Sequence, residues 1–128
     1  MKLKKTAILL VNLGSPDSPN PFSVFKYLTE FLTDKRVIDF PFFKRQALVR
    51  GIIVPSRFQN TAKSYSSVWS SKGGPLLQHS YLLKEALQKK MPQVIIEIAM
   101  RYQKPSIAKA LESLKKQNLD EIIVLPLY

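Results

Sequence analysis

Cysteine is absent from this 128-residue chain, which excludes both a disulfide framework and any metal site built on thiolates. A reducing compartment fits this composition. The chain has one histidine, His79, which cannot anchor a conventional metal site by itself. The nine acidic residues show no metal-binding spacing. We therefore expect no metal ligands in this chain.

Long hydrophobic runs and glycine-rich loops are also absent. No stretch reaches the roughly 18 apolar residues that are needed to span a bilayer. The basic start of the chain leads into the apolar run Ala7–Val11, which is too short for the core of a signal peptide. Among the four glycines, Gly73 and Gly74 precede a proline and form no phosphate-binding loop. We expect a cytoplasmic protein that is soluble or, as the alternative, peripheral to a membrane.

Acidic residues are scarce relative to basic ones. Twenty Lys and Arg against nine Asp and Glu give a formal charge of +11, which attracts anionic partners such as nucleic acid, lipid headgroups or carboxylated ligands. Much of this charge is spread along the chain, as on solvated helix faces. No aromatic-basic motif accompanies it, so we expect no nucleic-acid partner.

Three apolar runs predict buried strands, and amphipathic segments predict helices between them. This order predicts an α/β fold, a Rossmann-like open parallel sheet with flanking helices. The length suits one domain, spanning residues 1–128. The expected strands are Thr6–Leu13, Val94–Met100 and Glu121–Tyr128; the expected helices run from Pro21 to Thr33 or Asp34, and over Phe42–Ile53, Ser56–Ser70, Leu76–Lys90 and Ser106–Gln117.

The third expected strand, Glu121–Tyr128, runs to the last residue of the sequence. A strand buried in a parallel sheet is normally followed by a helix that covers the sheet face. We therefore infer a truncated gene product or an expressed fragment.

The carboxyl ends of the strands are where ligands bind in open α/β sheets. The groups at these ends are Asn12–Ser15, Arg101–Lys104 and Tyr128. An apolar, aromatic mouth with a few basic residues would suit a flat hydrophobic ligand that carries carboxylates, because arginine pairs with the acids.

Several unusual strings occur in an order and spacing that resemble one known family. They cover nearly the whole chain, and their matching order is far more specific than any one string. The strings are Val11–Asp17; Tyr27-Leu28 with Phe31-Leu32, Asp34 and Arg36–Asp39; Arg57, Ala62, Tyr65, Trp69 and Gly73–Leu76; Met100–Tyr102; Pro105–Ile107; and Val124–Tyr128. In these strings the chain resembles the amino-terminal portion of a ferrochelatase.

The resemblance implies a chelatase fold of two Rossmann-like domains with porphyrin in the cleft between them. It implies an enzyme, a lyase of haem biosynthesis, that inserts ferrous iron into protoporphyrin IX and uses no covalently bound cofactor. Residues 1–128 would be the amino-terminal domain. The family's catalytic histidine and glutamate lie in the carboxy-terminal domain, which is missing here. We therefore expect no catalytic residue in this chain, and the fragment should be inactive alone.

The resemblance also assigns four apolar positions to the porphyrin site. Leu13 stands where the family places a residue facing the porphyrin or the metal, and its apolar side chain would pack against the ring. Phe31, Val37 and Ile38 correspond to the apolar lip of the site, which lies against the membrane in membrane-associated members. Core packing is the alternative for all three of these residues; it is as good as the lip for Phe31, whereas the lip is favoured for Val37 and Ile38, which lie beyond the expected helix.

Polar and aromatic positions complete the expected porphyrin site. Arg57 matches a position suited to a porphyrin propionate, and Tyr65 offers ring contact and a hydroxyl. Arg101 and Tyr102 match a pair near the metal side of the pocket. One position departs from the family, because Gly74 stands where a serine usually supplies a hydroxyl.

Two other functions stay open. One is a naturally short, non-catalytic porphyrin- or haem-binding module, and the other is a basic α/β module for nucleic acid. The choice between protoporphyrin and coproporphyrin is also open, although an apolar lip favours the less carboxylated ring.

Overall fold

The computed structural model describes residues 2–128 and divides them into two compact units. The sheet unit contains the residues up to Gly14 together with Leu76–Tyr128. The helical unit is Ser15–Pro75. Within residues 2–128, no helix combines the length and the apolar character that a membrane crossing requires.

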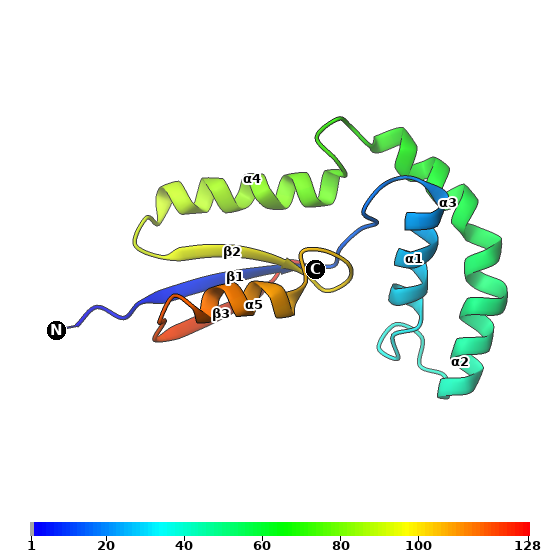
Figure 1. The fold of residues 1–128 in the computed structure, drawn as a ribbon, viewed down its shortest axis with the longest axis horizontal. Helices are drawn as coiled ribbons and strands as arrows, with labels where there is room; N and C mark the ends of the chain where they lie inside the picture. The colour runs from blue at the N-terminus through cyan, green and yellow to red at the C-terminus, as the bar shows by residue number, and fades with distance from the viewer. Residues whose placement is uncertain (1) are drawn as a thin grey trace. The chain divides into compact units, whose positions relative to one another are not determined.

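The sheet unit is built on three parallel strands (Figure 1). Strand β1 (Thr6–Asn12) lies in the centre, between β2 (Ile95–Met100) and β3 (Glu121–Pro126). In the register of the sheet, Leu10 lies beside Ile98 on one side and Leu125 on the other. The predicted open parallel sheet is confirmed.

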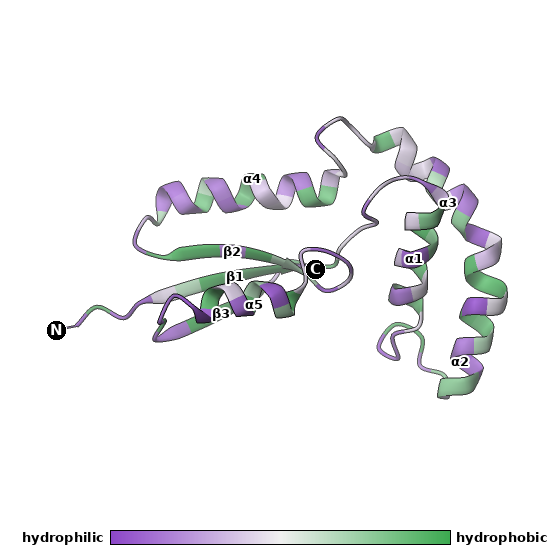
Figure 2. Ribbon diagram, in the orientation of Figure 1, coloured by the Kyte–Doolittle hydropathy of each residue, from purple (hydrophilic) through white to green (hydrophobic). Residues whose placement is uncertain are grey.

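The two faces of this sheet are covered by different helices, α4 (Pro75–Lys90) and α5 (Ile107–Lys115) (Figure 1). Successive side chains of a strand point to opposite faces. Leu9 of β1 therefore packs with Leu114 of α5. Leu10 packs on the other face, in the cluster that Leu77 of α4 joins. Figure 2 shows the strands as the most continuously hydrophobic elements of this unit.

The outer edge of β2 is occupied by side chains. The Ile96 N–H donates to Gln88 Oε1 at 3.0 Å, and the Gln88 amide donates to the Val94 carbonyl at 2.7 Å. The Ile98 N–H donates to Glu97 Oε1 at 3.0 Å, and the same oxygen pairs with Lys84 Nζ at 2.9 Å. These contacts satisfy backbone groups that would otherwise be available to another strand.

The outer edge of β3 is different. Among the described residues, no strand pairs with β3 on the side away from β1. Every residue of β3 is exposed, including Ile123 and Val124. The prediction of a strand here is confirmed, but the prediction that it is buried is wrong, because β3 is an edge strand. Its apolar side chains follow the pattern of a strand with a neighbour on both sides.

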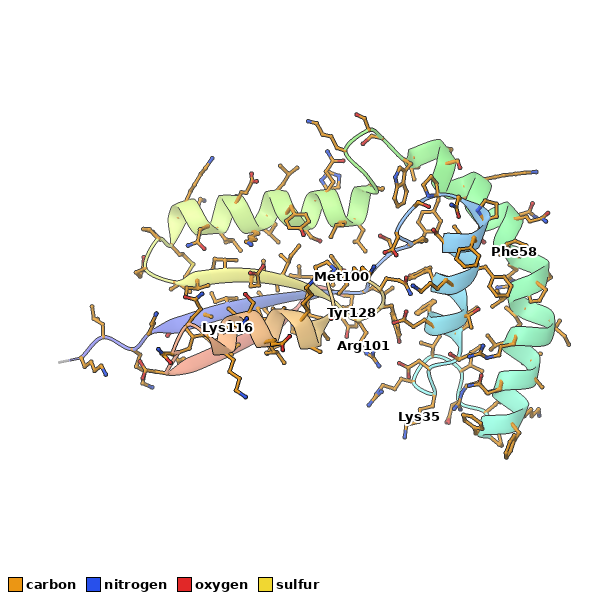
Figure 3. All side chains as sticks on the ribbon, viewed as in Figure 1. Lys35, Phe58, Met100, Arg101, Lys116 and Tyr128 are labelled. Carbon is orange, nitrogen blue, oxygen red and sulfur yellow. The ribbon has the colours of Figure 1, made fainter. Side chains whose placement is uncertain are left out.

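The helical unit pairs α1 (Pro21–Leu32) with a long helical run. Helix α1 begins as the sequence predicts, since Asn20 Oδ1 accepts from the Ser23 N–H at 2.9 Å and Pro21 stands at the first helical position. The Phe25 ring of α1 meets the Phe58 ring edge-on, with centroids 5.3 Å apart. Figure 3 labels Phe58 on the second helix of this pair.

The long run consists of α2 (Phe42–Leu48), a π-helical turn η1 (Val49–Ile53) and α3 (Val54–Val68). The sequence predicts two helices with a break before Ser56, but the helix continues through Pro55. Proline lacks an N–H, and its ring would clash with the carbonyl four residues earlier, that of Gly51. The wider π-turn displaces that carbonyl. In this turn the Val54 N–H donates to the Val49 carbonyl, five residues earlier, whereas in an α-helix it would donate to the Arg50 carbonyl.

Candidate functional site

The carboxyl ends of β1 and β2 bring Leu13, Arg101 and Tyr102 together. The Tyr102 N–H donates to the Leu13 carbonyl at 3.0 Å, and the Arg101 N–H donates to the Asn12 carbonyl at 2.8 Å. Tyr102 is buried, whereas Leu13 and Arg101 are half-buried. These three predicted site residues therefore share one end of the sheet unit, the end at which ligands bind in such sheets.

The close approach of these two strand ends depends on Gly14. Its φ is +109°, and a Cβ at this position would overlap the backbone carbonyl of Tyr102. Glycine alone avoids both problems, since it has no Cβ. Gly14 is thus a structural requirement at this end of the sheet, because it lets Leu13 and Tyr102 meet.

The Arg101 side chain lies over the Tyr102 ring, with Cζ 4.8 Å from the ring centroid. Such stacking holds a guanidinium against an aromatic face. Figure 3 labels Met100, Arg101 and Tyr128 at the same end of the sheet. The Leu127 N–H donates to the Val11 carbonyl at 2.8 Å, which ties the last residues to β1 just after β3 ends.

In the helical unit, Phe31 and Tyr65 belong to one row of aromatic rings. Phe31 stacks on Tyr27 with centroids 5.9 Å apart and planes 8° apart. Tyr27 meets Tyr65 edge-on at 6.4 Å, and Tyr65 meets Trp69 edge-on at 6.2 Å. The structure therefore joins two predicted residues through Tyr27 and places Trp69 at the end of the row.

Tyr27 and Trp69 were not among the residues that the sequence assigned to the site. Their spacing carried a usable signal, because Tyr27 and Phe31 are four residues apart on α1, and Tyr65 and Trp69 are four apart at the end of α3. Residues with this spacing are neighbours on a helix surface. Two such aromatic pairs on adjacent helices form a row when the helices pack.

The Tyr65 hydroxyl is held in its neutral form. Burial raises the pKa of Tyr65 above its ordinary value of 10.0, and the side-chain hydrogen bond with Tyr27 opposes part of this rise. A neutral phenol can donate a hydrogen bond to a carboxylate or contact an apolar ring without a charge. Tyr65 therefore keeps both possible roles throughout the neutral pH range.

Val37 and Ile38 lie in the loop between α1 and α2, outside any helix, as the sequence predicts. The N–H groups of both residues donate to the Asp34 carbonyl, at 2.9 and 3.1 Å. Val37 is exposed and Ile38 is half-buried. Arg57 is exposed on α3, so that its guanidinium is accessible to an anionic group.

The Gly74 position is filled by an aromatic ring. A Cβ on Gly74 would lie 2.7 Å from Cη2 and Cζ3 of Trp69. A serine at this position would therefore need the indole to move. In this structure, the Trp69 ring occupies the space that a side chain at position 74 would enter.

The predicted site residues thus form two sets. Leu13, Arg101 and Tyr102 lie in the sheet unit, while the remaining five lie in the helical unit. Within residues 2–128, no group of three or more His, Cys, Asp or Glu side chains is placed to hold a metal ion. The five in the helical unit are Phe31, Val37, Ile38, Arg57 and Tyr65.

Comparison with known proteins gives a consistent result. The family model described as Ferrochelatase matches residues 5–128. A ferrochelatase of Mannheimia succiniciproducens is 47% identical over 132 residues, which cover 100% of this chain and 41% of that protein. Ferrochelatases of Yersinia enterocolitica and Escherichia coli K12 are 43% and 42% identical to this chain. Each alignment covers 100% of this chain and 40% of the relative's length. The chain spans about two fifths of the length of these curated relatives.

Proposed function

Because the chain belongs to the ferrochelatase family, we propose that it is the porphyrin-binding, amino-terminal domain of an enzyme that inserts ferrous iron into protoporphyrin IX. The observation that carries this proposal is the family match, which extends from residue 5 to residue 128. Ferrous iron and porphyrin are then substrates of the complete enzyme.

The chemistry of the two residue sets supports a porphyrin ligand. A porphyrin is a flat apolar ring with carboxylate side chains, so it needs apolar and aromatic contacts together with cations. In the helical unit, the row Phe31–Tyr27–Tyr65–Trp69 supplies aromatic surface, and Arg57 supplies an accessible cation. In the sheet unit, Leu13 is apolar, and Arg101 is held over Tyr102.

Iron insertion also requires chemistry that the proposal does not assign to this chain. Two pyrrole protons must leave the ring as two new bonds to iron form, so a base must accept protons. His79 is exposed on α4 and outside the family's catalytic motif. We therefore place the base and the iron-handling groups in the remainder of a longer polypeptide and expect no iron insertion by the 128-residue chain. Turnover well above the spontaneous rate would contradict this assignment.

The edges of the sheet support a continuation of the domain. Side chains occupy the outer edge of β2, whereas β3 presents exposed apolar residues and an edge that no described strand pairs with. Parallel sheets of this class are covered on both faces. A further strand beside β3, with its helix, would cover Ile123 and Val124.

Substitution of Arg57 tests the porphyrin assignment. We expect Arg57→Met to weaken protoporphyrin binding by up to about fivefold, because an exposed pairing with a propionate contributes up to about 1 kcal/mol. The measurement is a titration of the 128-residue chain with protoporphyrin IX, followed by the porphyrin absorption band. Arg50→Met is the matched control, since Arg50 is exposed on the same helical run. Equal affinities of both variants would contradict a role for Arg57.

We also propose that the lip side of the helical unit makes a peripheral contact with the cytoplasmic surface of a membrane. Phe40, Phe42 and Phe43 are exposed close to the lip residue Val37, and we call them the phenylalanine patch. Lys44 lies over Phe40, with Nζ 4.8 Å from the ring centroid. Exposed aromatic rings beside a lysine are suited to an anionic lipid surface.

The patch can be tested with Phe43→Ser, because Phe43 is 84% exposed. We expect this change to lower the partition coefficient onto anionic lipid vesicles by about tenfold to a hundredfold, as the loss of one inserted phenylalanine removes roughly 1.5–3 kcal/mol. Phe22→Ser is the control, since Phe22 is 78% exposed but lies in the first turn of α1. Cosedimentation with vesicles measures both. The same loss in the two variants would exclude a specific contact through the patch.

A further inference from the structure

We infer that Arg45 is a positioning residue: its buried guanidinium fixes the loop between α1 and α2 and so holds Val37 and Ile38 in place to meet a porphyrin ring. This inference rests on the proposed porphyrin-binding function. It concerns a residue that the family resemblance does not assign, in a sequence context, Lys44-Arg45, that suggests surface charge.

Arg45 is unusual because it is a charged residue in the interior of the helical unit. It lies in the last turn of the short helix α2 and is 8% exposed. Its Nε donates to the Thr33 carbonyl at 2.8 Å, and its Nη1 donates to the Phe40 carbonyl at 2.5 Å. The Cζ atom lies 5.9 Å from the centroid of the Phe42 ring. The two carbonyl acceptors compensate for the hydration that the guanidinium loses on burial, so Arg45 has a defined position, unlike a solvated surface charge.

The two acceptors stand at the two ends of the same loop. Thr33 is the C-cap of α1, and Phe40 comes directly before Pro41, the N-cap of α2. One side chain therefore bridges the points at which the loop leaves one helix and enters the next. Inside this bridge, the Phe40 N–H donates to the Ile38 carbonyl at 3.0 Å. The backbone conformation of Val37 and Ile38 is thus fixed from outside as well as from within.

The charge of Arg45 also has an electrostatic reason. The last turn of α1 contains no basic residue, although a cation at a helix C-terminus is favourable. Arg45 supplies this cation from the next helix, because its Nε reaches the carbonyl of the C-cap residue. Loss of the guanidinium would leave two carbonyls without these donors and the end of α1 without its compensating charge.

The geometry requires an arginine specifically. The guanidinium carries donors on separate nitrogen atoms of one rigid plane, so Nε and Nη1 can serve two carbonyls in different directions. A lysine retains the positive charge but has a single nitrogen on a flexible stem. Arg45→Lys therefore separates the effect of charge from the effect of bridging.

The experiment combines hydrogen exchange with porphyrin titration on the 128-residue chain. We expect Arg45→Lys and Arg45→Met to speed amide exchange of Val37, Ile38 and Phe40 by about tenfold or more, because each variant loses at least one of the two hydrogen bonds that the guanidinium donates. Amide exchange of Ala62 in α3 reports whether the unit stays folded. The affinity for protoporphyrin IX should fall by a similar factor, with a smaller shift of the porphyrin absorption band.

The control is Arg50→Lys, in which Arg50 donates from Nε to Gln46 Oε1 on the exposed surface at 2.7 Å. Its exchange and its porphyrin affinity should match the wild type. Unchanged loop exchange in Arg45→Lys would overturn the bridging role. Faster loop exchange with unchanged porphyrin affinity would overturn the positioning role. A wild-type chain that binds no porphyrin would overturn the proposed function, and the positioning role with it, whatever the exchange rates.

Discussion

Gly14→Ala is expected to lower the free energy of unfolding of the sheet unit by about 3 kcal/mol or more. The added Cβ would overlap the carbonyl oxygen of Tyr102, and the φ of +109° at this position is unfavourable for alanine. Relief of the overlap requires the ends of β1 and β2 to separate, which breaks the hydrogen bond from the Tyr102 N–H to the Leu13 carbonyl. Urea unfolding followed by circular dichroism measures the loss.

Two other glycines make matched controls for this change. Gly73 also has a positive φ, +103°, but a Cβ there meets no atom within 4 Å, so Gly73→Ala isolates backbone strain at about 1–2 kcal/mol. Gly51 has open space and lies in η1, where alanine should stabilise the helix by up to about 1 kcal/mol. If Gly14→Ala cost no more than Gly73→Ala, the overlap with Tyr102 would not limit this position.

The second large effect is expected for Leu10→Ala, which should lower the free energy of unfolding by about 2–5 kcal/mol. Leu10 is 1% exposed and packs among Ile96, Ile98 and Met100 on the α4 face. Its truncation leaves a cavity that the central strand cannot close, because both neighbouring strands fix its backbone. Chemical denaturation with a two-state fit provides the number.

Leu125→Ala is the matched control, because Leu125 is the register partner of Leu10 on β3. It is the same residue type one strand away, yet it is 47% exposed. In the 128-residue chain, its loss should therefore be less than about 1 kcal/mol. In a longer polypeptide with a further strand beside β3, the two substitutions should become similar. A small effect of Leu125→Ala in that longer protein would contradict the proposed continuation of the domain.

The regular part of the fold was predictable because hydrophobic periodicity determines it. The strand runs and the amphipathic helices were each recognised within a few residues of their observed bounds, and Asn20-Pro21 marked the start of α1. The continuous helix through Pro55 was not predicted, since a proline normally indicates a break. Its tolerance depends on a π-turn, which is a tertiary adjustment with no periodic signal.

The exposure of β3 and the burial of Arg45 both show that residue type alone does not predict burial. Composition indicates that Ile123 is interior and Arg45 is exterior, yet the structure places each the other way. A strand is buried only when another element covers it, and the Arg45 guanidinium is buried where fixed carbonyls accept its hydrogen bonds. Both conditions depend on how elements pack in three dimensions, which the periodicity of a single segment does not report.

The candidate site was predictable where it follows from strand ends. The meeting of Leu13 with Tyr102 follows from the parallel order of β1 and β2, as expected for this class of sheet. The contribution of Tyr27 and Trp69 depends on how α1 packs against α3. The roles of Phe31, Tyr65 and Arg57 with porphyrin stay predictions.

The contrast between the two sheet edges sets how such molecules could associate with each other. Within residues 2–128, the Gln88 and Glu97 side chains bond the Ile96 and Ile98 N–H groups at the β2 edge, whereas no strand pairs with the outer edge of β3. A molecule with one unpaired strand edge can pair with one partner, after which neither molecule has an unpaired edge. Polymerisation by edge pairing needs two unpaired strand edges on each molecule. For the 128-residue chain, edge pairing through β3 is therefore expected to stop at two copies.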